Sequence, residues 1–256
     1  ALGYLVGALV LGTAFPHLLR FTAAEVPWQR VMQGTSFLAV MGGLLIWWLI
    51  PDGPYRRSGT AFKPAAIIAI FRIPDFRAAA LGYFGHMWEL YAFWAFVPVI
   101  VLARFPELPP ASTALFAFGV IGVGAIGCIL GGYWSLRTGS AKVAYVMLLI
   151  SGLLCLASPL LFQLPGWAFT ALLFLWGFAV VGDSPQFSTL VARNAPPESR
   201  GSALTIVNSI GFAMTIFSIQ GLTFLSQYWG ISNSLWILFL GPVLGLTATR
   251  RLFRSA

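Results

Sequence analysis

The sequence contains few charged residues. Only 9% of its 256 residues are charged and 59% are hydrophobic, whereas an ordinary soluble domain has about 25% charged residues. A soluble protein of this size must cover its surface with charged side chains, and 15 basic and 7 acidic residues are too few to do so. The composition therefore excludes a water-soluble globular protein and predicts an integral membrane protein whose surface mostly faces lipid.

Cysteine and histidine are also scarce, at two residues each. Cys128 and Cys155 both lie inside apolar runs, so their spacing indicates neither a disulfide framework nor a metal site. The net charge of +8 comes from basic residues scattered between apolar runs, whereas nucleic-acid binding requires basic residues clustered on one exposed face. We therefore expect no metal, no cofactor and no nucleic-acid partner.

Long apolar runs are what the sequence does contain. A helix needs about 20 mostly apolar residues to cross a bilayer, and eight runs of that kind are present. The runs are continuously apolar and do not alternate with polar residues, which favours helices over a β-barrel. The fold class predicted is an all-α membrane protein with eight transmembrane helices. The predicted spans cover residues 1–19, 31–50, 78–103, 110–136, 141–164, 167–190, 203–227 and 230–249.

The basic residues predict the orientation, because loops rich in Lys and Arg stay on the cytoplasmic side. If the first span runs outward, the outer segments hold only Arg20, Arg30 and Arg104. The cytoplasmic segments hold Arg56, Arg57, Lys63, Arg72, Arg77, Arg137, Lys142, Arg193, Arg200, Arg250, Arg251 and Arg254. This asymmetry predicts a cytoplasmic C-terminus, in an inner or plasma membrane, and a long cytoplasmic connection over 51–77. Its apolar patch at 65–71 is too short to span the bilayer and is predicted to be interfacial.

One loop carries a family resemblance. Gly132, Arg137, Gly139 and Lys142 have the spacing of the short cytoplasmic loop of the major facilitator superfamily, commonly written G-x-L-A-D-R-x-G-R-K. Leu136 stands where that family usually has its aspartate. In the family the acid helps to latch helices on the cytoplasmic side, so the departure predicts an altered latch in this half.

A second loop resembles the same family. The segment 196–203, with Arg200 and Gly201 at its centre, is similar to the P-x-x-x-R-G-x-A connection between the tenth and eleventh helices. The resemblance implies two six-helix halves joined by a cytoplasmic linker and related as repeats. The eight spans would then be helices five to twelve, so we expect a partial bundle that lacks its first four helices.

This placement divides the chain into three parts. The predicted parts are the last two helices of the N-terminal half at 1–50, a linker at 51–77 and a six-helix C-terminal half at 78–256. The chain begins at Ala1, without Met and already inside an apolar run, which agrees with an expectation of preceding helices.

Two acidic residues lie inside predicted spans, and charge at that depth usually faces a cavity or a partner. Glu89 lies near the middle of its span, and His86 is three positions earlier, on the same helix face. One interpretation is that Glu89 binds a coupling proton or a cationic group, with His86 as its hydrogen-bond partner. The alternative is that a protonated Glu89 is satisfied between helices and holds the bundle together.

Asp183 is the second intramembrane acid, two residues before Pro185, which removes a helix hydrogen bond. It is a candidate for a cytoplasmic-side gate with Arg193 or Arg137, for a structural pair, or for the substrate path. Further polar residues within spans are candidates for the substrate path or for interhelical hydrogen bonding. They are Gln186, Asn208 and Gln220.

These features predict a secondary active transporter that moves a small solute by alternating access, and not an enzyme. The expected partners are a small-molecule substrate, membrane lipid and the preceding helices of the same protein. Proton coupling at Glu89 is the favoured energy source. The alternative is a multi-span membrane enzyme or a channel-like protein, yet neither converging catalytic residues nor rings of like residues are visible.

Overall fold

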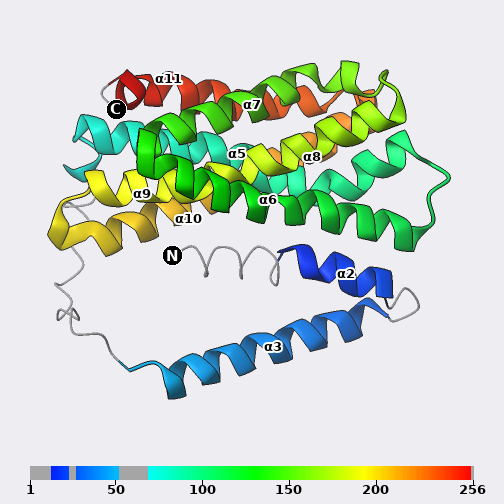
Figure 1. The fold of residues 1–256 in the computed structure, drawn as a ribbon, viewed down its shortest axis with the longest axis horizontal. Coiled ribbons are helices and arrows are strands. Elements are labelled where there is room, and N and C mark those ends of the chain that lie inside the picture. The colour runs from blue at the N-terminus through cyan, green and yellow to red at the C-terminus, as the bar shows by residue number, and fades with distance from the viewer. Residues whose placement is uncertain (1–12, 23–26, 52–68, 255–256) are drawn as a thin grey trace.

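The computed structural model describes residues 13–22, 27–51 and 69–254, and every regular element in these ranges is a helix (Figure 1). The elements, with the labels of Figure 1, are α2 (Phe15–Thr22), α3 (Trp28–Leu49), α5 (Pro74–Arg104), α6 (Pro110–Thr138), α7 (Ser140–Leu161), α8 (Gly166–Gly182), α9 (Ser184–Asn194), η2 (Pro197–Ser199), α10 (Arg200–Trp229), η3 (Leu235–Phe239) and α11 (Leu240–Arg254). The prediction of an all-α membrane protein is confirmed.

Seven helical stretches in the described ranges are long and apolar enough to cross a membrane. They correspond to seven of the eight predicted spans, while most of the first span, 1–19, lies outside the described residues. The predicted start of the last span at 230 is wrong. Residues 230–234 form turns, and helical structure resumes as the 3-10 helix η3 at Leu235.

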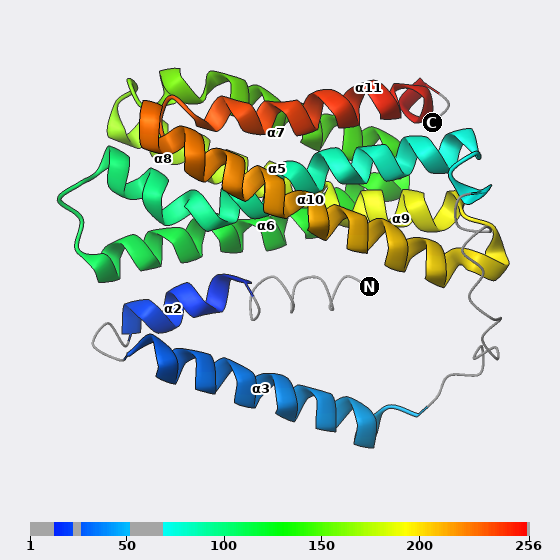
Figure 2. The same ribbon diagram turned by 180° about the vertical axis from the view of Figure 1, so that it is seen from behind.

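The spans from α5 to α11 pack into one bundle, in which α5 contacts α6, α9, α10 and α11. Outside this bundle, α2 packs on α6, and α3 packs on α2 without burying any of its own residues. Figures 1 and 2 show α3 apart from the bundle in both views. The chain therefore presents a packed six-span bundle with two helices attached at its side.

Local sequence fixes where these helices begin and end. Pro74 and Pro110 occupy first-turn positions, where a missing N–H costs no hydrogen bond. Gly139, which separates α6 from α7, has φ 84°, a conformation that favours glycine. Its N–H closes α6 by donating to the carbonyl of Ser135 at 2.9 Å. A single residue can therefore reverse the chain between two spans.

Glycines bring two pairs of helices into direct backbone contact. A Cβ on Gly85 of α5 would overlap the carbonyl oxygen of Gly241 on α11, and a Cβ on Gly241 would overlap the carbonyl oxygen of Gly85. Between α6 and α8, a Cβ on Gly177 would overlap the carbonyl oxygen of Val120. Small residues at such crossings allow the close packing that replaces the hydrophobic driving force in lipid.

The span predicted at 167–190 is interrupted as Pro185 indicated. Helix α8 ends at Gly182 and α9 begins at Ser184, with Asp183 between them. The carbonyl of Asp183 accepts backbone N–H groups from Gln186 at 3.0 Å and Phe187 at 2.9 Å. The interruption places an acidic side chain at a helix junction inside the bundle.

One end of the bundle carries an exposed ion pair and the last described residues of the predicted linker. At the end where α5 begins and α11 finishes, Asp75 pairs with Arg251 at 2.8 Å, with both side chains exposed. Only residues 69–71 of the patch predicted to be interfacial are described, and there Ile70 is buried against the bundle. The bundle itself begins at Pro74, four residues before the predicted 78.

Candidate functional site

Glu89 lies at the midpoint of α5 with its side chain fully buried. The indole Nε1 of Trp176 on α8 donates to Oε1 at 2.7 Å, and the hydroxyl of Ser151 on α7 donates to Oε2 at 2.9 Å. Each carboxyl oxygen therefore has a neutral donor from a different helix. Glu89 joins three spans at the centre of the bundle.

The partners of Glu89 are held by their own packing. The Trp176 ring lies against Phe93, with centroids 4.8 Å apart, and the Ser151 hydroxyl also lies 3.2 Å from the carbonyl of Leu148. Neither Trp176 nor Ser151 was predicted from the sequence. The sequence did contain one signal, the mid-span position of Trp176, because tryptophan usually lies at the membrane interface.

His86 is not the partner of Glu89 that the sequence suggested. Its Nδ1 lies 2.8 Å from Oδ1 of Asp183, and both side chains are fully buried. The two atoms lie within ion-pair distance of each other. Residues three apart on a helix share a face, but the neighbouring helices determine which side chains each of them meets.

Aromatic rings surround His86. The ring centroids of Tyr83 and Phe187 each lie 5.9 Å from the imidazole centroid. Phe187 fits beside Gly82, since a Cβ at that glycine would collide with the Phe187 ring. The face of α5 that carries Gly82, His86 and Glu89 thus packs against other helices of the bundle.

Asp183 pairs with His86 and with no arginine among the described residues. Arg193 and Arg137, the partners considered from the sequence, are exposed and lie in the last turns of α9 and α6. Depth explains the difference, because Asp183 is about 15 Å along the helix axis from Arg193 at 1.5 Å per residue. The arginine pairing is therefore corrected to a histidine pairing.

The other polar candidates lie in different environments. Gln186 is buried one turn after Asp183, whereas Asn208 is half-buried and Gln220 exposed on α10. The structure therefore groups Glu89, His86, Asp183 and Gln186 in the bundle interior and leaves the two α10 residues outside that group. In the part of the chain that is described, no three His, Cys, Asp or Glu side chains gather as a metal site would require.

Comparison with known proteins identifies the family. The model of the Major Facilitator Superfamily matches residues 1–219. The chain belongs to the major facilitator superfamily. This family consists of transporters, so the chain is not classed as an enzyme. No curated protein matches the chain.

A solved structure has the same fold. The crystal structure of the E. coli fucose:proton symporter matches with a TM-score of 0.66 and 19% sequence identity. The match covers 90% of this chain and 55% of that one, so the chain spans about half the length of the symporter. At this identity the likeness concerns the fold.

Both loop motifs of this superfamily member lie at the bundle end where α5 begins. Gly132 and Arg137 are in the last turns of α6, Gly139 forms the turn, and Lys142 is in the first turn of α7. The side chain of Leu136, at the family's aspartate position, is 82% exposed. Arg200 and Gly201 begin α10 and are both exposed, with open space around Gly201.

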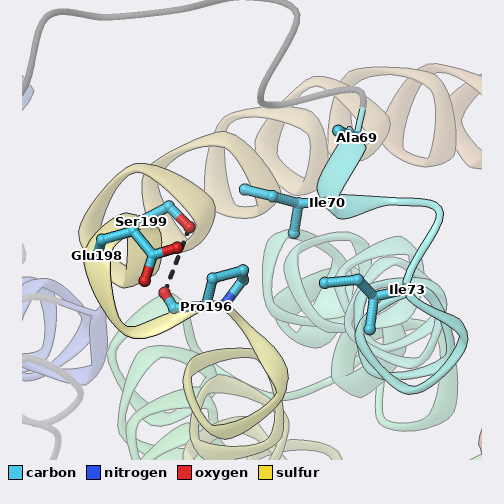
Figure 3. A pocket seen from close by; sticks show the side chains of 6 residues that line it. All are labelled: Ala69, Ile70, Ile73, Pro196, Glu198 and Ser199. Carbon is cyan, nitrogen blue, oxygen red and sulfur yellow. Dashed lines mark hydrogen bonds between the residues drawn. The ribbon is translucent and has the colours of Figure 1, made fainter.

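A pocket at the same end is separate from the buried polar group (Figure 3). Its volume is about 260 Å³, and it lies between the segment before α5 and the connection from α9 to α10. The Ser199 hydroxyl donates to the carbonyl of Pro196 at 3.3 Å beside it. The lining residues are Ala69, Ile70, Ile73, Pro196, Glu198 and Ser199.

Proposed function

We propose that the chain is part of a secondary active transporter that moves a small solute by alternating access, with a proton bound at Glu89 as the coupling ion. Membership of the superfamily and the symporter-like fold support transport. Because the chain spans about half of the symporter's length, we propose this activity for the whole protein.

The proposed organisation assigns α2 and α3 to helices five and six and the bundle from α5 to α11 to the second six-helix half. The contact between α2 and α6 supports a junction of the two halves at that side. The described basic residues support a cytoplasmic location, in an inner or plasma membrane, for the end where α5 begins. At that end lie Arg72, Arg77, Arg137, Lys142, Arg193, Arg200, Arg250, Arg251 and Arg254, against Arg20, Arg30 and Arg104 at the other.

The chemistry around Glu89 is the observation that carries the coupling proposal. The hydrogen bonds that its carboxyl group receives from Trp176 and Ser151 come from neutral donors, and no lysine or arginine in the described ranges pairs with it. A buried carboxylate without a cation is costly, which favours a bound proton. The two donors offset part of that cost, so the ionised form is accessible when the bundle changes conformation.

The first test replaces Glu89 by glutamine, which keeps size and hydrogen bonding but removes the titratable proton. In proteoliposomes of the full-length protein, Glu89→Gln should abolish uphill, pH-driven accumulation. Exchange of solute at equal concentrations should survive, because exchange requires no net proton release. Fucose is the first solute to assay, since the solved neighbour is a fucose:proton symporter.

The matched control is Glu107→Gln, which removes an exposed acid from the loop between α5 and α6 and should accumulate solute normally. A second measurement, infrared spectroscopy, tests the same two variants without any solute. Infrared difference spectra across pH should contain a carboxylic acid C=O band that Glu89→Gln eliminates and Glu107→Gln retains. Full accumulation by Glu89→Gln would instead support a purely structural Glu89.

A further inference from the structure

Two polar atoms of the His86–Asp183 pair are buried without a hydrogen-bond partner among the described residues. They are Nε2 of His86 and Oδ2 of Asp183, whereas Nδ1 and Oδ1 lie 2.8 Å from each other. Both side chains are fully buried, so bulk water does not reach them. Buried polar atoms are nearly always hydrogen-bonded in native proteins, and each unsatisfied group costs about 1–3 kcal/mol. The pair therefore requires a further hydrogen-bonding partner.

The missing partner must both donate and accept. Nε2 of His86 and Oδ2 of Asp183 take no part in the single 2.8 Å contact that joins Nδ1 to Oδ1. An internal water molecule typically makes about three hydrogen bonds, to buried groups that are otherwise unsatisfied. The types of these atoms match that requirement, whereas an anion would be repelled by Asp183.

The charge of the pair follows from its surroundings. The titratable groups that lie near it on the packed helices are Tyr83 and Glu89 on α5 and Cys128 on α6. None of these groups carries a positive charge in either protonation state, and no lysine or arginine in the described ranges pairs with Asp183. His86 is thus the available counterion for Asp183, and an imidazolium beside a carboxylate leaves no net charge in the interior.

We propose that His86 and Asp183 form a buried imidazolium–carboxylate pair that binds internal water at the junction of α8 and α9. This site is distinct from the Glu89 site and does not depend on proton coupling there. We also infer that a proton leaving Glu89 passes through this site, and that part of the inference rests on the proposed function.

The position of the site suits that use. His86 is about 4.5 Å from Glu89 along α5, toward the end of the helix that carries Asp75. Phe187, one turn after Asp183, is fully buried beside the His86 ring. In this conformation the pair is therefore covered by an apolar ring on the side of α9.

The test observes the imidazole directly. The transporter is labelled with ¹⁵N-histidine and ¹⁵N-tryptophan, placed in lipid bilayers at pH 7 and studied by solid-state NMR. The signals lost in His86→Gln are assigned to His86, and those lost in Trp176→Phe are assigned to Trp176. Both ring nitrogens of His86 should carry protons, and magnetisation should pass from water to the ring. The Nε1–H of Trp176, which already donates to Glu89, is the internal control and should receive little from water.

Two variants decide the charge pairing. Asp183→Asn should convert His86 to a neutral imidazole with one bare ring nitrogen, while Glu89→Gln should leave the imidazolium signals in place. Gel filtration and tryptophan fluorescence establish that each variant is folded. A neutral His86 in the parent protein, or a spectrum unchanged by Asp183→Asn, would overturn the ion pair. Magnetisation transfer from water to the His86 ring that is no greater than the transfer to Trp176 would overturn the proposed water binding. Failure of coupling at Glu89 would leave all these signals unaltered, so the two proposals fail separately.

Discussion

Two buried polar sites lie one turn apart on α5, and they are satisfied in opposite ways. Glu89 has a neutral, aligned donor for each oxygen, supplied by α7 and α8. His86 has the carboxyl group of Asp183 at 2.8 Å, and its Nε2 has no partner among the described residues. Neutral donors tolerate a carboxyl group with or without its proton, whereas the charged pair proposed above needs both members. The comparison separates a group that we propose to gain and lose a proton from a pair that we propose to keep its charge.

The largest effect should come from breaking the charged pair. Asp183→Ala leaves His86 buried without its counterion and should lower the free energy of unfolding by about 3–5 kcal/mol. The double variant Asp183→Leu/His86→Leu should cost less than the sum of Asp183→Leu and His86→Leu made singly, because no uncompensated charge remains. Unfolding in mixed detergent micelles measures Asp183→Ala and these three leucine variants. Strictly additive single effects would show that the two side chains are not paired.

A smaller effect should follow from removing one donor to Glu89. Trp176→Phe keeps a ring against Phe93 but removes the indole N–H that reaches Oε1, and it should cost about 1–3 kcal/mol. The control is Trp167→Phe, since the Trp167 side chain is 78% exposed. The same unfolding assay compares them, and equal stability of the two variants would contradict the hydrogen bond to Glu89.

The smallest effect is expected at the second donor. Ser151→Ala removes a hydroxyl shared between Glu89 and the Leu148 carbonyl, and interhelical hydrogen bonds in membranes average about 0.6 kcal/mol. Ser209→Ala is the control, because that exposed hydroxyl bonds within its own helix. A loss for Ser151→Ala larger than for Trp176→Phe would reverse the ranking of the two donors.

Much of the fold could be predicted because each span is a local property of the sequence. The apolar run at 110–136 became α6 at Pro110–Thr138, and Pro185 indicated the interruption between α8 and α9. The start of the last span was misplaced because residues 230–234, with the sequence Gly-Ile-Ser-Asn-Ser, form turns ahead of the apolar run that begins at Leu235. Hydropathy measures transfer into lipid, not local backbone conformation.

The candidate site was predictable only in part. Charge inside an apolar span singled out Glu89 and Asp183, since such residues are costly wherever the helix faces. The partners could not be predicted, because Trp176 lies 87 positions and Ser151 62 positions from Glu89. Those contacts depend on how each helix is rotated about its axis, which periodicity on one helix does not determine. The pairing of His86 with Asp183 was missed for the same reason.

The crossing of α5 and α11 at Gly85 and Gly241 has an evolutionary consequence. At most packed contacts, a larger side chain on one helix can be accommodated by a smaller one on the other. Here each glycine faces the other's carbonyl oxygen, and a backbone atom cannot be made smaller. Compensatory substitution is therefore closed at this crossing, so Gly85 and Gly241 are expected to tolerate replacement less than residues whose contacts are made by side chains alone.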